Sequence, residues 1–340
     1  TMGETWSVPL VGKVDISGTP TWIAFMGSGY DTWDPTERAG NYFYAVDIAT
    51  GQILKSLEIS EHSEPASPFG IVNTVPGSPN GADNDRDGNT EDVYFGDLHG
   101  RFWKIDLTTG INQWKAEVLY RDPYYHPIVT KPAVYVDLTT MVVTLYFGTG
   151  GDEKAPGTEY YSFVALKDGG ATGVVQWYLG PADLAVRLGI DNALKKGEFT
   201  QGEKIWADDV IADRLVYIAT LTGNIESLNP CMTLSGSGRI YSRYISGGQT
   251  GGSALIGATG TAIESMVTAQ KVRSAVTVGK LEQLTQEGSP TINKRLVFIQ
   301  SYTQPGGARP EPPSEVLAQP VPIYSRLSIK SWREVYKIIR

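Results

Sequence analysis

The sequence is poor in several residue types on which common functional classes depend. One cysteine, Cys231, stands among 340 residues, so no disulfide can form within the chain. No apolar run approaches the roughly 18 residues of a membrane-crossing helix. No run of Lys or Arg marks a nucleic-acid surface, and the formal net charge is −8. We therefore predict neither a membrane span nor a nucleic-acid partner.

Residues typical of hydrolytic sites are scarce as well. The three histidines, His62, His99 and His126, all fall in expected turns or loops, where a lone histidine is usually structural or solvated. The Gly-x-Ser-x-Gly pattern of a nucleophile elbow is absent, and Ser-Gly-Ser-Gly at residues 235–238 lacks its spacing. Cys231 has no histidine nearby in the sequence and is expected to be inert. We predict that the chain is not an enzyme.

Turn-forming and aromatic residues are abundant. The chain has 38 glycines and 20 prolines together with 18 tyrosines and 8 tryptophans, a combination that favours many short strands over long helices. Hydrophobic residues make up 41% and charged residues only 19%, so a sizeable core can be buried.

A degenerate repeat runs through the sequence. A short run of β-branched and aromatic residues leads through a glycine-containing turn to a second alternating run, which ends in an Asp or Asn turn. The copies cover residues 22–51, 93–110, 145–169 and 215–230, and a weaker copy begins at Arg295. Strand pairs cannot bury their apolar faces alone, so the copies must stack on one another.

The repeat predicts an all-β fold, a modified β-propeller with long inserted loops, formed by residues 1–340 as a single domain. The loops are needed because the copies start roughly 50 to 80 residues apart, farther than in a simple propeller. A β-sandwich with irregular loops is the alternative. Residues 181–196 are expected to form a short helical insertion, since Leu184 and Leu188 fall on one helical row. Residues 303–320 contain five prolines and are expected to form an exposed loop.

Residues 83–91, Asp-Asn-Asp-Arg-Asp-Gly-Asn-Thr-Glu, have the spacing of a calcium-binding loop. Glycine at the sixth position permits a sharp backbone turn, and alternate side chains of such a loop can point to one centre. The predicted ligands are the carboxylates of Asp83, Asp85, Asp87 and Glu91 and the backbone carbonyl of Asn89. A dense set of hard oxygen ligands suits Ca²⁺ better than Mg²⁺, which retains its waters.

Two other interpretations fit this loop less well. An acidic, solvated turn would leave four like charges within nine residues to repel one another, which a cation would relieve. An EF-hand would need a bidentate Glu at the twelfth position, which Tyr94 occupies here, and flanking helices, which the sequence does not predict. We therefore expect a shortened loop closed by Glu91, with Asp92 as a possible substitute and Asp97 too far along the chain.

The loop and the strand after it resemble one known family. DVYFGDLHGRFWKIDL at residues 92–107 closely resembles the C-terminal domain of the PilY family of type IV pilus proteins. Shorter resemblances are GETWSVP at residues 3–9, GEKIWAD at residues 202–208 and SWRE at residues 331–334. Together they touch the start, middle and end of the chain.

The resemblance implies the C-terminal β-propeller of a larger exported protein, located at the cell surface (pilus tip), the outer membrane or the periplasm. It also implies that calcium occupancy of the loop modulates pilus extension and retraction, twitching motility and adhesion. The implied partners are pilins or other pilus tip and assembly proteins, with host surfaces contacted through regions outside this chain. The loop ends in Glu91 where the family usually has Asp.

Two alternatives stay open beside this function. The calcium loop could be a purely structural staple in a surface adhesin. The strand pattern also resembles quinoprotein dehydrogenases, which are propellers that bind pyrroloquinoline quinone and calcium. Those enzymes collect metal ligands from several blades, whereas the loop at residues 83–91 is contiguous.

Overall fold

The computed structural model describes residues 2–31, 38–61, 63–152, 154–212, 214–222 and 237–248, and the backbone of six strands between residues 255 and 321. His62 and Cys231, both expected to be inert, lie outside these residues. Within the described residues, no helix has the length and apolar character needed to cross a membrane.

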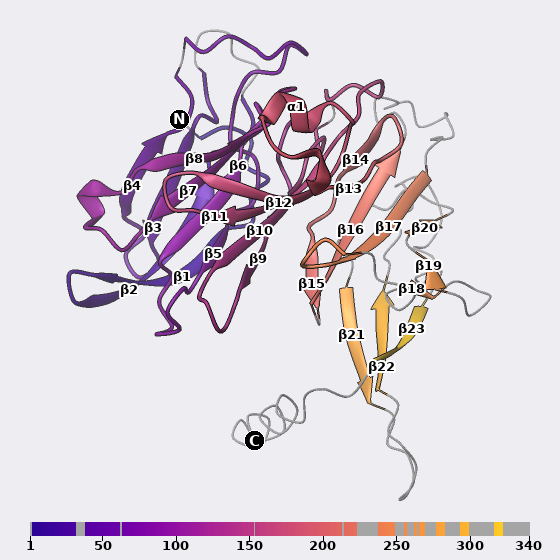
Figure 1. Cartoon of the computed structure of the whole chain (residues 1–340). Coiled ribbons are helices and arrows are strands. Elements are labelled where there is room, and N and C mark those ends of the chain that lie inside the picture. Colours follow the sequence, from indigo (N-terminus) through magenta and orange to yellow (C-terminus); the bar gives the residue numbers. More distant parts are fainter. Residues whose placement is uncertain are drawn as a thin grey trace, which may run out of the picture.

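The first two sheets are four-stranded antiparallel meanders, each with its strands in chain order (Figure 1). The first contains β1 (Leu10–Ile16), β2 (Thr19–Gly27), β3 (Tyr42–Asp47) and β4 (Ile53–Glu58). The second contains β5 (Asn80–Ala82), β6 (Asp92–Gly96), β7 (Arg101–Asp106) and β8 (Ala116–Arg121), with the 3₁₀ helix η1 (Ile111–Gln113) before β8.

Two five-stranded sheets follow. The third sheet is the antiparallel meander β9 (Ala133–Val136), β10 (Val143–Gly148), β11 (Phe163–Asp168) and β12 (Gly173–Leu179), with β13 (Lys195–Gly197) added in parallel to β12. In the fourth, β16 (Leu215–Thr222) pairs with β14 (Glu203–Ile205), β15 (Val210–Ala212) and β17 (Ser237–Tyr244), and β17 pairs with β20 (Ser265–Thr268).

The last strands are described by their backbone. A three-stranded sheet contains β21 (Thr277–Glu282), β22 (Asn293–Phe298) and β23 (Val316–Val321), and a small hairpin contains β18 (Leu255–Ile256) and β19 (Ala262–Ile263). An early strand of each main sheet contacts its counterpart in the next: β1 with β5, β5 with β9, β9 with β15, and β15 with β21. This radial succession of meanders is a β-propeller, so the predicted fold class is confirmed and the sandwich alternative is wrong.

Aromatic contacts between sheets build the core. Phe43 of the first sheet stacks on Phe95 of the second with ring centroids 4.1 Å apart, and Phe102 of the second stacks on Phe147 of the third at the same distance. All residues of β6 are buried, because both faces of the second sheet are covered. This double burial explains why the repeat contains continuous apolar runs.

A glycine ends the second strand of the first three sheets, where the chain entering the next sheet passes close by. A Cβ added at Gly27, Gly96 or Gly148 would lie 2.1, 2.3 or 2.4 Å from the nearest atom of Val75, Ile128 or Ile205, respectively. Only glycine leaves room for this approach. The repeated glycine in the sequence therefore marks the packing of one blade on the next.

Helix is shorter in the structure than the sequence indicates. In the segment 181–196, α1 (Leu184–Leu188) is followed by the 3₁₀ helix η2 (Asn192–Leu194), and β13 begins at Lys195. Gly189 ends α1 by adopting a φ of 66°, a left-handed conformation that glycine tolerates.

The expected loop at residues 303–320 lies outside the described residues up to residue 315. Its last five residues belong to β23 instead, which corrects the prediction for that part. Pro320 is compatible with this strand because β23 lies at the edge of its sheet, where a missing N–H is tolerated.

Candidate metal centre

The acidic loop connects β5 to β6 in the second sheet. Ala82 at the end of β5 pairs with Asp92 at the start of β6, and the N–H of Glu91 donates to the carbonyl of Ala82 at 2.9 Å. The carbonyl of Glu91 accepts from the N–H of Leu107 at 2.7 Å. Residues 83–91 are thus a nine-residue loop held against its own strand pair.

The structure brings four of the predicted ligands together. One carboxylate oxygen from each of Asp83, Asp85, Asp87 and Glu91 lies within 4.8 Å of the others. Oxygens that share one Ca²⁺ at about 2.3–2.6 Å can be at most about 5 Å apart, on opposite sides of the ion. The spacing of these four side chains therefore fits one calcium-sized cation.

The backbone of the loop turns the aspartates inward. Arg86 and Gly88 adopt positive φ values of 70° and 83°, and Gly88 occupies the position where the sequence predicts a sharp turn. The N–H groups of Arg86 and Gly88 donate to Oδ1 and Oδ2 of Asp83 at 2.5 and 3.0 Å. The N–H of Asp87 donates to Oδ1 of Asp85 at 3.1 Å.

Asn89, predicted to contribute its carbonyl, is fixed by Asp87. Its backbone N–H donates to Oδ1 of Asp87 at 2.7 Å, and its side-chain amide donates to Oδ2 at 2.5 Å. The side-chain Oδ1 of Asn89 is buried and has no hydrogen-bond partner within the described part of the chain. The role of its backbone carbonyl as a ligand stays a prediction.

Glu91 is the carboxylate of the group with the clearest electrostatic strain. Burial raises its pKa, and the charges of Asp83, Asp85 and Asp87 raise it further. The N–H of Asn84, which donates to Oε2 of Glu91 at 2.5 Å, acts in the opposite direction. A cation at this point would favour the ionised form, because it would supply the opposite charge that the loop lacks.

Asp92, expected as a substitute ligand, lies buried at the base of the loop, where β6 begins. It accepts from the side-chain amide of Asn84 at 2.5 Å and lies 3.1 Å from Nζ of Lys104. Burial raises the pKa of Asp92, and Lys104 partly offsets that effect. Lys104 also lies 2.7 Å from Asp168 at the end of β11, and Tyr94 donates to the same Asp168 oxygen at 2.7 Å.

The loop is also tied to the first sheet. The N–H of Thr90 donates to the carbonyl of Lys13 on β1 at 2.7 Å. A Cβ added at Gly12 would lie 2.6 Å from Oγ1 of Thr90, so the side chain of Thr90 requires a glycine there. The contacts of Thr90, Lys104 and Asp168 join three sheets around the loop, and sequence reasoning missed all three residues.

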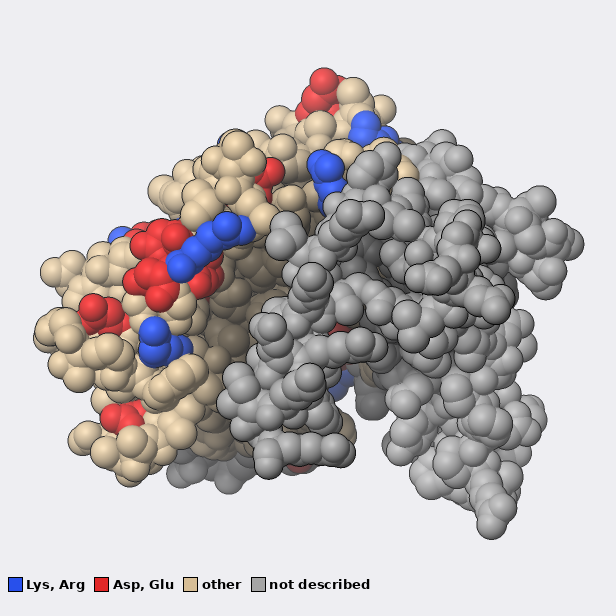
Figure 2. Space-filling view, turned by 90° about the horizontal axis from the view of Figure 1, so that it is seen from below, with Lys and Arg blue, Asp and Glu red and all other residues tan. Residues whose placement is uncertain are grey.

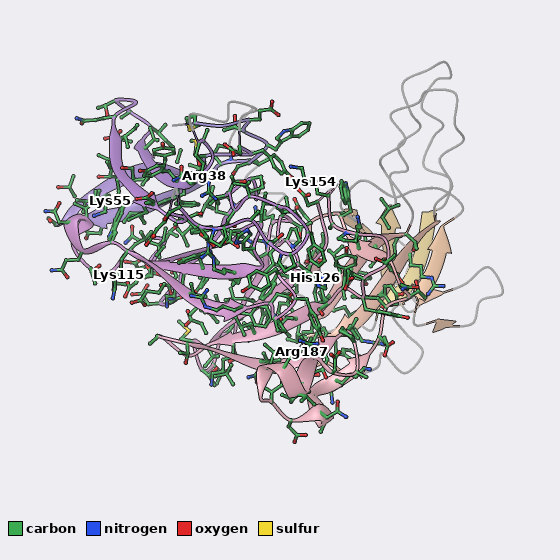
Figure 3. The ribbon with its side chains drawn as sticks, turned by 90° about the horizontal axis from the view of Figure 1, so that it is seen from above. Arg38, Lys55, Lys115, His126, Lys154 and Arg187 are labelled. Carbon is green, nitrogen blue, oxygen red and sulfur yellow. The ribbon has the colours of Figure 1, made fainter. Side chains whose placement is uncertain are left out.

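The two described histidines lie in well-packed surroundings away from the loop. Nδ1 and Nε2 of His99 are each 2.9 Å from a partner, Glu64 Oε1 and the carbonyl of Ile71. His126 lies in the interior, where its ring stacks with those of Phe69 and Tyr124, in contrast to the peripheral Lys55 and Lys115 (Figure 3).

Asp97 lies at the far end of β6 from the loop. It accepts from Arg101 Nε at 2.6 Å and from Trp103 Nε1 at 2.9 Å. Asp97 thus takes part in a separate buried network, as its distance along the sequence had indicated.

On the surface, Asp and Glu side chains gather in one patch on the face seen in Figure 2, beside Lys and Arg side chains.

Comparisons with known proteins give consistent results. The family model of the PilY1 beta-propeller domain matches residues 1–123, which contain the first two sheets and the acidic loop. A type IV pilus biogenesis factor PilY1 homolog of Xylella fastidiosa is 31% identical over 130 residues, 38% of this chain and 8% of the relative. Type IV pilus biogenesis factor PilY1 of Pseudomonas aeruginosa is 33% identical over 106 residues, 31% of this chain and 8% of the relative.

A solved structure shares the fold. The crystal structure of the C-terminal domain of Pseudomonas aeruginosa PilY1 matches with a TM-score of 0.58 and 16% identity, covering 94% of this chain and 73% of that chain. The aligned segments of the curated relatives span only 8% of their length. The names of these relatives describe pilus biogenesis factors and no enzyme, in agreement with the non-enzymatic prediction.

Proposed function

Because this chain is a PilY-type protein with a β-propeller fold, we propose that it is a calcium-responsive, non-enzymatic domain of a type IV pilus biogenesis protein. Calcium occupancy of the loop at residues 83–91 would modulate pilus extension and retraction, and through them twitching motility and adhesion. The protein would act in the cell envelope, at the cell surface or pilus tip, with pilins or other pilus assembly proteins as partners.

The observation that carries this proposal is the convergence of four carboxylates within 4.8 Å. At neutral pH these groups repel one another: burial raises the pKa of Glu91 most, and the charges of its three acidic neighbours raise it further. Calcium would cancel the repulsion and order the loop. Oxygen ligands in this number suit an affinity anywhere from sensors to extracellular modules, roughly 10⁻⁷ to 10⁻³ M.

The surroundings of the loop suggest how occupancy could reach a partner. Thr90 ties the loop to β1, and Asp92 ties its base through Lys104 to Asp168 on β11. Ordering of the loop would therefore favour one conformation of the surface that these three sheets form around it. We propose that a pilin or another assembly protein recognises that surface in its calcium-bound form.

The same contacts support a second candidate, a structural staple. An ion that clamps three sheets together would stabilise the fold whether or not it enters and leaves in the cell. The staple predicts that loop variants reduce the amount of folded protein, whereas regulation predicts altered pilus number at an unchanged protein level.

Calorimetric titration of calcium into this chain tests the binding itself. Asp83→Asn and Asp87→Asn should each weaken binding at least tenfold while the fold is retained. Asp15→Asn, which removes one charge from the neighbouring strand β1 outside the acidic group, serves as the matched control and should bind like the unaltered chain. Unchanged calcium binding in both loop variants would overturn the proposal.

The same substitutions in the full-length protein, introduced into piliated cells, separate the two candidates. Altered pilus number with normal protein level favours regulation, and loss of the protein favours the staple.

A further inference from the structure

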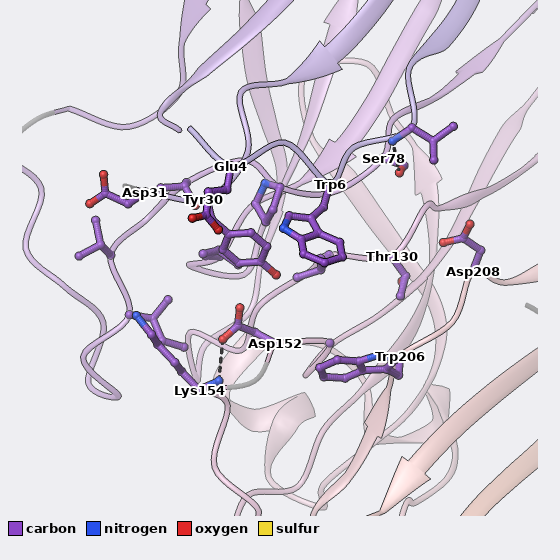
Figure 4. A pocket seen from close by; sticks show the side chains of 18 residues that line it. Glu4, Trp6, Tyr30, Asp31, Ser78, Thr130, Asp152, Lys154, Trp206 and Asp208 are labelled. Carbon is purple, nitrogen blue, oxygen red and sulfur yellow. Dashed lines mark hydrogen bonds between the residues drawn. The ribbon is translucent and has the colours of Figure 1, made fainter. Parts of the chain in front are cut away.

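A pocket of about 630 Å³ opens at the centre of the propeller (Figure 4). Its walls come from the segments that precede β1, β5, β9 and β15 and from those that follow β2, β6 and β10. The acidic loop follows the end of β5, whereas Ser78 of the pocket wall precedes its start. The pocket and the acidic loop therefore lie at opposite ends of β5.

The size and lining of the pocket match those of ligand sites. Pockets for small ligands occupy about 300–1,000 Å³ and combine apolar walls with a few convergent polar groups. Here three aromatic residues line the space: Trp6, which is 74% exposed, together with Tyr30 and Trp206. A tryptophan left this exposed beside a cavity offers an unoccupied ring face.

The charged groups of the pocket are predominantly acidic. Glu4, Asp31, Asp152 and Asp208 line it, and Lys154 is the one cationic side chain among its described lining residues. The indole face attracts cations more strongly than other aromatic rings do. Aromatic faces and carboxylates together are complementary to an organic cation.

Asp152 supplies a buried anchor for such a cation. Its side chain is only 4% exposed and accepts from the backbone N–H of Lys154 at 2.8 Å and from the side chain of Tyr30. In Figure 4 the side chains of Trp6, Tyr30 and Trp206 gather around it. A buried carboxylate gains most from a cation that enters its cavity, because water screens their attraction little there.

Two threonine hydroxyls in the pocket wall lack hydrogen-bond partners among the described residues. Thr74 and Thr130 line the same pocket, are 0% and 7% exposed, and have hydroxyls without a hydrogen-bond partner in the described part of the chain. Both hydroxyls are covered by the wall itself, so they give the wall a polar interior but do not contact an occupant of the cavity as it stands.

We propose that this central pocket binds the basic side chain, arginine above all, of a peptide segment of a partner protein. The guanidinium stacks on the indole rings of Trp6 and Trp206 and pairs with Asp152 in the interior. Arginine fits better than lysine because its planar group stacks on aromatic faces and donates several hydrogen bonds at fixed angles. The site is separate from the acidic loop and does not depend on calcium.

The test is calorimetric titration of the whole chain, in a chelator, with N-acetylargininamide and with N-acetylcitrullinamide. The two molecules have nearly the same shape and differ in charge. We expect the arginine compound to bind at least tenfold more tightly than the citrulline compound. Equal binding of the two, or no binding of either, would overturn the proposal, as would tight binding of an uncharged oligosaccharide in place of the arginine compound.

Two variants locate the site, and a third serves as control. Trp6→Ala removes an exposed side chain and should weaken binding of the arginine compound about fivefold or more. Asp152→Asn keeps an acceptor for the N–H of Lys154 but removes the charge, so it should lower the preference for arginine over citrulline. Trp22→Ala on β2, where the side chain is 56% exposed and away from the pocket, should bind unchanged. Unaltered binding in both pocket variants would place the site elsewhere and refute the assignment.

Discussion

The backbone N–H of Asn84 donates to Oε2 of Glu91 at 2.5 Å, which joins the two ends of the acidic loop through a side chain seven residues away. This bond holds the last carboxylate beside the first three. It also competes with burial and with three neighbouring aspartates for control of the pKa of Glu91, which remains raised. The ionisation of Glu91 therefore depends both on repulsion from the three aspartates and on whether calcium is bound.

Glu91→Gln should change stability in opposite directions with and without calcium. In a chelator the substitution removes one of four like charges, so the melting temperature should stay the same or rise by a few degrees. With saturating calcium the variant loses a ligand, and its calcium-dependent rise in melting temperature should shrink markedly. Thermal melts under both conditions check this, with Glu117→Gln on β8, a partly exposed carboxylate outside the acidic group, as the control. A melting temperature that falls in the chelator would contradict the repulsion argument.

Calcium affinity should decrease as the pH falls. The raised pKa of Glu91 means that the folded chain takes up a proton there at a higher pH than the unfolded chain does. In a chelator, this group therefore makes the fold less stable as the pH rises from the unfolded pKa through the folded one. Calcium competes with that proton, so titrations toward acidic pH should show progressively weaker binding. An affinity independent of pH through this range would mean that Glu91 is not a ligand.

The packing of Thr90 on Gly12 should tune the loop without removing any ligand. Gly12→Ala places a Cβ 2.6 Å from Oγ1 of Thr90, and the loop must shift to relieve the clash. We expect calcium affinity to fall several-fold. Thr90→Ala removes the clashing hydroxyl, so the double variant should bind more tightly than Gly12→Ala alone. Calorimetry on the unaltered chain, the two single variants and the double variant gives the coupling free energy between the two positions. Strictly additive effects on calcium affinity would contradict the proposed contact.

The clustering of the acidic side chains was predictable from the sequence because these residues are close together along the chain. The carboxylates recur at alternate positions within nine residues, and Gly88 supplies the turn, so no knowledge of the sheet order was needed. The propeller was predictable from the repeated strand pattern and from the Asp turns. Asp47, Asp106 and Asp168 each accept from the N–H of the residue two positions later, as the pattern indicated.

The supports of the loop were not predictable in the same way. Lys104 and Asp168 are 64 residues apart, and their contact depends on the packing of the second sheet on the third. The contact of Thr90 with Gly12 likewise depends on the position of β1 beside β5. The extent of the helix after residue 181 also escaped prediction, because the left-handed turn at Gly189 overrides the apolar periodicity around it.

Lys104→Met should destabilise the fold strongly. Nζ of Lys104 lies 3.1 Å from Asp92 and 2.7 Å from Asp168, and all three side chains are largely buried. Removal of the cation leaves two buried carboxylates without a counter-charge, which typically costs about 3–5 kcal/mol. Urea unfolding checks the value. Asp168→Asn added to Lys104→Met should restore part of the loss, and a double variant no more stable than Lys104→Met would contradict this account.

His126→Phe should stabilise the chain most at acidic pH. Burial lowers the pKa of His126 to about 3, and neither ring nitrogen has a hydrogen-bond partner in the described structure. Between pH 6.5 and 3 the unfolded chain binds a proton that the folded chain does not, so each pH unit of acidification costs about 1.4 kcal/mol. Burial raises the pKa of the neighbouring Asp122 to about 7, which has the opposite effect: the contribution of Asp122 to the free energy of unfolding falls as the pH rises from 3.8 toward 7.

In the unaltered chain the effects of His126 and Asp122 on stability nearly cancel. With phenylalanine stacked in place of the imidazole, only the effect of Asp122 remains, so the gain over the unaltered chain should grow steadily as the pH falls from 6.5 to 4. Asp122→Asn should produce the reverse, a chain whose stability drops on acidification. Urea unfolding at several pH values measures both slopes, and parallel profiles for all three proteins would show that neither group titrates as described.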